Sequence, residues 1–250
     1  MRRCILAVLC LLCLLPLIAC RSHKPVSAGS AVVRAEGYTP EQILSYFAGI
    51  AFGSEYGGYR GTLCKWEDEI ALWIDGEYGE DEVAVVADLM DRLNGIDGFP
   101  GIRYAETEAA ANFRLHFVMQ GNLTDYFGER AETSSGMSQF SFQKSTGIIL
   151  EAQAGVASNI TPRNAKTSVI CEELLQSLGL TSDSYAFPES VFYEGYNGSV
   201  RPAPIDWALL EILYHETIIP GMAYGEAMEA AASLLGIPYA ESEEEETVYG

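Results

Sequence analysis

One segment constrains the fold more than any other, because residues 169–180 predict a helix that is buried on one side and ends at a glycine. Gly179 occupies the position where a helix C-terminus favours a left-handed residue. Glu172 and Gln176 are four residues apart, so their side chains meet on one face, and Glu173 lies beside them. The apolar residues recur at helical spacing: Val169, Ile170, Leu174, Leu175 and Leu178.

Residues 1–20 have the pattern of a bacterial lipoprotein signal peptide. Two arginines precede an apolar run that is too short to span a bilayer, and residues 17–20, Leu-Ile-Ala-Cys, resemble a lipobox. We therefore expect Cys20 to carry a lipid that anchors the chain in the bacterial cell envelope, facing the periplasm. Arg21 is not an aspartate, which favours the outer membrane over the inner membrane by resemblance to enterobacterial sorting.

The rest of the chain divides into a tether, one domain and a tail. Residues 21–37 are polar and lack periodicity, which predicts a flexible tether. Residues 38–237 predict a single domain, and residues 238–250 predict an acidic, disordered tail. Hydrophobic residues make up 48% of the 250 residues, which is enough for one sizeable core.

The composition limits the partners that the chain can have. Acidic residues outnumber basic ones by 35 to 15, and the formal net charge is −20. Such a surface argues against nucleic acid as a partner and against charge-driven binding to anionic lipid. We therefore expect contact with the membrane through the lipid on Cys20, and a peptide or an envelope protein as a further partner.

Two cysteines, Cys64 and Cys171, remain outside the predicted signal peptide and lipidation site. In an oxidising periplasm they could form a disulfide that ties the first strand region to the central helix. They could equally be two separate buried thiols, because sequence spacing alone does not set disulfide geometry. Both alternatives stay open at the level of sequence.

Periodicity predicts an α+β domain without internal repeats. Asn112 to Met119 is the clearest strand, with His116 on its exposed or rim face. Residues 121–136 read as a polar loop, and residues 152–163 read as a connection into the central helix. Helices are expected at 39–52, 81–93, 169–178, 204–214 and 223–235, and strands at 63–74, 102–104, 112–119, 137–142 and 147–151.

The central helix resembles the active-site helix of zincin metalloproteases. The zincin motif H-E-x-x-H, followed by x-L-G-L, corresponds here to E-E-x-x-Q-S-L-G-L. The resemblance puts the general base at Glu173 and the three ligands of the extended metzincin motif at Glu172, Gln176 and Ser182. It also implies a small, mixed, twisted sheet packed on helices and a mainly helical C-terminal part. Phe192 stands where the metzincin turn has methionine.

A closer resemblance is to a family of bacterial lipoproteins with domain of unknown function 2927, which implies no activity. The stretches that carry it are 46–55, 63–66, 111–113, 172–180, 190–192, 214–215 and 220–222.

The zincin-like positions lack the residues that a zinc site requires. A catalytic zinc needs about three protein ligands, usually histidines and carboxylates, and none of the three positions holds a histidine. We therefore expect no cofactor and no zinc. Glu172, Gln176 and Asp183 are weak candidates for an oxygen-ligated metal such as Ca²⁺ or Mg²⁺.

Three functions follow from these residues. The first is a non-proteolytic binding module for a peptide or envelope partner, with β-addition at the strand near 137–142. The second is a peptidase-like hydrolase that uses Glu173 as general base, with Glu172 and Gln176 beside it and an oxygen-ligated metal or none. The third is a structural lipoprotein whose polar helix residues hold neighbouring loops. The sequence favours a protein that is not an enzyme.

Overall fold

The computed structural model describes residues 32–53, 61–195 and 201–239. The predicted signal peptide with Cys20, the tether before Val32 and the tail after Tyr239 therefore lie outside the described residues. Within the described ranges, no helix is both long enough and apolar enough to cross a membrane.

Five strands form one mixed sheet in the order β2-β1-β3-β5-β4. The strands β2, β1, β3 and β5 run parallel to one another, whereas β4 pairs antiparallel with β5 and forms one edge. The expected α+β class with a mixed sheet is thus confirmed. The strands span Ile70–Gly76 (β1), Ile102–Tyr104 (β2), Phe113–Val118 (β3), Gly136–Phe142 (β4) and Ile149–Ala157 (β5).

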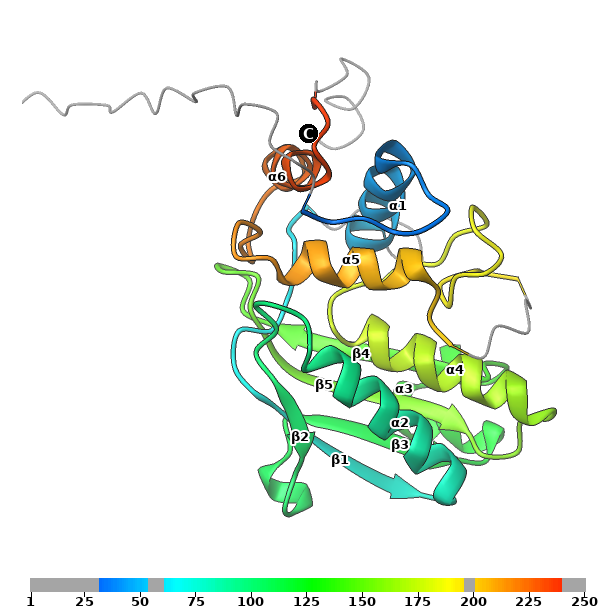
Figure 1. Ribbon diagram of the computed structural model, residues 1–250. Helices are drawn as coiled ribbons and strands as arrows, with labels where there is room; N and C mark the ends of the chain where they lie inside the picture. Colours follow the sequence, from blue (N-terminus) through cyan, green and yellow to red (C-terminus); the bar gives the residue numbers. More distant parts are fainter. Residues whose placement is uncertain (1–31, 54–60, 196–200, 240–250) are drawn as a thin grey trace, which may run out of the picture.

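Six α-helices accompany the sheet in the described residues. They span Pro40–Phe52 (α1), Glu80–Leu93 (α2), Thr124–Phe127 (α3), Arg163–Gln176 (α4), Pro204–Tyr214 (α5) and Tyr224–Leu235 (α6). Figure 1 shows α2 and α4 side by side over one face of the sheet, with α5, α1 and α6 stacked beyond them. The mainly helical C-terminal part is therefore confirmed.

Local sequence explains where the first helix begins. Thr39 accepts a hydrogen bond from the backbone N–H of Gln42, and the Gln42 side chain accepts one from the backbone N–H of Thr39. Pro40 follows at the first helical position, where its missing N–H costs nothing. This capping box is confirmed as predicted.

The two faces of the sheet differ in what covers them. On β3, Phe113, Leu115 and Phe117 are buried and face α2 and α4, which we call the inner face. The alternating residues Arg114 and His116 point to the opposite, outer face. The main core therefore lies between the inner face and the helices.

Short helices cover part of the outer face, where the sequence predicted only a polar loop at 121–136. The segment comprises the 3₁₀ turn Gln120–Leu123, α3, and the 3₁₀ turn Glu129–Ala131. A second small core holds it to the sheet, made of Leu123, Phe127, Ala131, Met137 and Ala157. The loop prediction was wrong because a few apolar residues suffice to bury so short a segment.

Two further boundaries correct the sequence analysis. The strand expected at 147–151 is β5, and it continues to Ala157 through residues that were read as a connection. The predicted tether also ends earlier than residue 37, because Val33 and Ala35 are buried in the main core. Val33 is held there by a hydrogen bond from its backbone N–H to the carbonyl oxygen of Leu234 on α6.

Candidate functional site

Glu173, the predicted general base, lies where α4 packs closely against β4. Only 5% of its surface is exposed. The strand contributes Gly136 at this point, and a Cβ atom there would come within 2.5 Å of Glu173 Oε1 and 2.3 Å of Val169 Cγ1. The carboxylate is therefore packed against the backbone of an edge strand. This position does not fit a base that must meet water and substrate.

Gln176 lies one turn further along α4, and both ends of its amide are engaged. Its Oε1 accepts a hydrogen bond from Ser138 Oγ on β4 at 3.1 Å, and its Nε2 donates to Asp183 Oδ1 at 2.7 Å. Gln176 is 4% exposed, so these two bonds replace the water that it gives up. The amide thus joins α4 to β4 and to the loop that follows the helix.

Sequence reasoning missed Ser138, because nothing in the spacing of the motif indicates a partner on another strand. The inner face of β4 brings it to Gln176 across 38 positions of sequence. The signal that could have located it is the expected edge strand at 137–142 together with alternation along that strand. Ser138 thus joins β4 to the α4 motif through its hydrogen bond to Gln176.

Glu172 and Ser182 hold the other two positions that resemble the ligands of the metzincin motif. Glu172 and Ser182 are half-buried, and Ser182 Oγ lies where a Cβ at Gly53 would come within 2.5 Å. Asp183 meets the N–H side of the Gln176 amide, which is a hydrogen-bond arrangement and not one that shares a cation. Among the described residues there is no group of three or more His, Cys, Asp or Glu suited to a metal.

A second buried carboxylate, Asp206, holds the turn that contains Phe192. Asp206 is fully buried at the start of α5 and accepts hydrogen bonds from Ser190 Oγ and from the backbone N–H groups of Val191 and Ala203. Tyr46 on α1 donates to Ser190 Oγ at 2.7 Å. The network therefore fixes the turn between α1 and α5.

Burial dominates the electrostatics of this network. It raises the pKa of Asp206 from 3.8 to about 6, although the three hydrogen bonds act in the opposite direction. Burial also raises the pKa of the Tyr46 hydroxyl far above its usual range. A carboxylate enclosed in this way serves the turn and is not open to a substrate.

No disulfide joins Cys64 and Cys171 in the structure, and both side chains are buried. Burial raises the pKa of the Cys171 thiol to about 12. A thiol with such a pKa stays protonated at neutral pH and is a poor nucleophile.

His116 corrects a further expectation, because it is 4% exposed and not at an exposed rim. Its Nδ1 lies 2.8 Å from Asp75 Oδ1 on β1, and its ring stacks on Tyr126 of α3 with the centroids 4.2 Å apart. The helical segment over the outer face accounts for the burial. His116 lies on the face opposite to α4, so the structure does not bring it together with Glu173.

Comparison with known proteins agrees with the closer of the two sequence resemblances. The family described as protein of unknown function DUF2927 matches residues 40–232. The chain belongs to the DUF2927 family. Its matched region includes every strand of the sheet and nearly all of the helical part, from α1 into α6. No curated protein matches the chain, so the family supplies a relationship and no activity.

Proposed function

We propose that this DUF2927 protein is a lipid-anchored protein of the bacterial cell envelope whose zincin-like domain binds an extended peptide or partner segment without cleaving it. The lipid on Cys20 would hold it at the membrane, facing the periplasm, with the outer membrane favoured. The zincin-like reading is supported by the mixed sheet with an antiparallel edge strand and by the motif helix α4 against that strand.

The observation that carries the proposal is the place of β4. It ends the strand order, and β5 is its one paired strand among the described residues. An extended segment added beside β4 would gain backbone hydrogen bonds, while side-chain pockets would provide specificity. Because Ser138 and Gln176 hold the inner side of β4 to α4, the edge would be rigid before the ligand arrives.

The alternative is the hydrolase with Glu173 as general base. The packing of Glu173 against Gly136 argues against it, because a base needs hydrogen-bond reach to the proton that it removes. The hydrogen bond between Gln176 and Asp183 likewise argues against an oxygen-ligated metal at these positions. The geometry therefore favours the binding module.

Fluorescein-labelled casein, an unfolded chain, tests binding and cleavage in one experiment. With the full-length protein in detergent, we expect fluorescence anisotropy to rise saturably and then to stay constant, because the casein is bound and remains intact. Hydrogen exchange at the β4 amides should slow on binding. A Glu173→Gln variant serves as the matched control and should behave like the wild type.

Two outcomes would contradict the proposal. An anisotropy that falls with time, and stops falling in Glu173→Gln, would establish the hydrolase. An anisotropy that never rises would remove the edge of β4 as a site for extended chains.

A further inference from the structure

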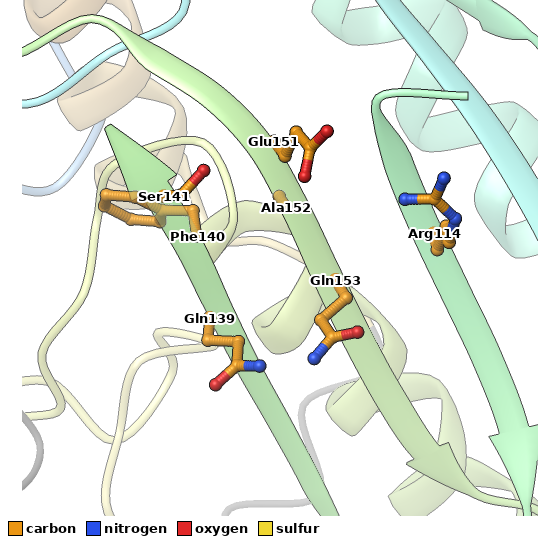
Figure 2. Close-up of a pocket in the computed structure, with 7 residues that line it drawn as sticks. All are labelled: Arg114, Gln139, Phe140, Ser141, Glu151, Ala152 and Gln153. Atoms are coloured by element: carbon orange, nitrogen blue, oxygen red, sulfur yellow. The ribbon is translucent and has the colours of Figure 1, made fainter. Parts of the chain in front are cut away.

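The outer face of the sheet carries a polar groove that lies on the opposite side from α4. It has a volume of about 330 Å³ and is lined by residues of β3, β4 and β5. Figure 2 shows the amides of Gln139 and Gln153 next to each other, with Glu151 and Arg114 further along the same surface. The short helices over the outer face border this groove, because Arg130 bonds to Gln139 and Gln153 bonds to the carbonyl oxygen of Tyr126.

Strand register arranges the groove side chains in a row. Trp73 on β1 is opposite Arg114 on β3, Arg114 is opposite Gln153 on β5, and Gln153 is opposite Gln139 on β4. Residues directly opposite each other in a sheet present their side chains on the same face. An aromatic ring, a guanidinium and two amides therefore follow one another across four strands.

Arg114 is the residue in this row whose positive charge lacks an ion-pair partner in the described part of the chain. It is half-buried on β3. Among the groove residues Arg114 is the one cationic side chain, so it is the group that would bind an anionic part of a ligand. Its fork of N–H donors matches a carboxylate in geometry and charge.

The neighbouring groups define the rest of the ligand. Gln139 Oε1 already accepts from Arg130, which leaves the Gln139 NH₂ group to donate to the groove. Gln153 Nε2 donates to the carbonyl oxygen of Tyr126, which leaves Gln153 Oε1 to accept. Glu151 adds acceptors that suit hydroxyl groups. The groove thus offers donors and acceptors side by side, with an aromatic ring at the end of the row.

We propose that this groove binds a carboxylate-bearing sugar. The carboxylate would pair with Arg114, the hydroxyl groups would bond to Gln139, Gln153 and Glu151, and the apolar face of the sugar ring would lie on Trp73. Sugar hydroxyl groups both donate and accept hydrogen bonds, so they match the adjacent amides of Gln139 and Gln153. The proposal does not rest on the peptide edge proposed above, although β4 contributes to both sites.

Trigalacturonic acid and its uncharged counterpart galactotriose are the probes, titrated by calorimetry into the full-length protein in detergent. We expect trigalacturonic acid to bind more tightly than galactotriose. Arg114→Gln should weaken trigalacturonic acid about tenfold or more, since it removes a charge-assisted pair, and should leave galactotriose unchanged. Arg103→Gln is the matched control on β2, outside the groove, and should change neither affinity.

Arg114→Lys keeps the charge and the aliphatic stem but loses the fork, so it should fold normally and give an intermediate loss. The proposal is overturned if trigalacturonic acid shows no saturable binding, if both sugars bind equally, or if Arg114→Gln and Arg114→Lys bind like the wild type. The proposal would also be overturned if neither sugar binds and labelled casein binds to the wild type but not to Arg114→Gln. That result would assign the groove to a peptide instead.

Discussion

The strand β4 presents polar side chains to both faces of the sheet, and the two sets differ in what they meet. On the inner face, Ser138 meets Gln176 of α4, and both amide ends of Gln176 are engaged inside the protein. On the outer face, Gln139 and Gln153 line an open groove beside Arg114. Gln176 thus has its hydrogen-bond partners inside the protein, whereas the outer groove is open, and this contrast supports binding rather than catalysis as our proposal.

The largest expected effect comes from the glycines that let other elements approach the two faces. Gly136→Ala should lower the free energy of unfolding by about 3 kcal/mol, because the new Cβ would meet Val169 and Glu173 of a buried helix. Gly155→Ala places its methyl against the ends of Phe127 and Leu123 in the short outer helices, which can shift, so we expect about 1 kcal/mol. Urea unfolding of both variants measures the two losses, and equal losses would break the comparison.

The pH dependence of folding stability tests whether Asp206 is buried on the helical side of the molecule. Its folded pKa of about 6 lies above the unfolded value, so the folded state binds the proton more tightly. This contribution to stability is complete below about pH 4 and is lost as pH rises through 6, a total change of about 3 kcal/mol. Asp206→Asn should remove it, so stability falls less between pH 4.5 and 7.5 in the variant. Identical pH profiles would contradict the burial of this carboxylate.

Two glutamines allow a smaller, matched test. Gln176→Ala should cost about 1–2 kcal/mol, because it leaves Ser138 and Asp183 without the amide that joins them. Gln153→Ala, on the outer face, should lower the free energy of unfolding by at most about 0.5 kcal/mol, since its single hydrogen bond to Tyr126 is long at 3.3 Å. Thermal unfolding measures both losses of stability. A loss in Gln153→Ala as large as that in Gln176→Ala would contradict the account.

The sequence predicted elements well where local signals are strong. Thr39 with Gln42 marked the start of α1, and the helix beginning at Pro204 was predicted with its correct ends. The C-terminal half of β5 was missed because residues 152–157 are mostly alanine and glycine, which carry no bulky alternation. Those small residues are needed there, since Phe127 and Leu123 pack directly over Gly155.

The sequence predicted the helix that carries the candidate site, but it did not predict which residues of other elements contact that helix. The spacing placed Glu172, Glu173 and Gln176 on one buried helix, but burial of Glu173 depends on Gly136, which is distant in sequence. His116 was taken for an exposed residue because alternation predicts faces and does not reveal what covers them. The outer groove depends on strand register between β3, β5 and β4, which periodicity alone does not supply.

The most direct test of the central claim is elemental analysis of the full-length protein, purified without chelators. The measurement is made beside a Glu172→Ala, Gln176→Ala double variant whose fold is checked by circular dichroism. We predict no stoichiometric metal in either protein, because Gln176 and Asp183 bond to each other. One equivalent of metal per chain that is lost in the double variant would contradict this account and would favour the hydrolase.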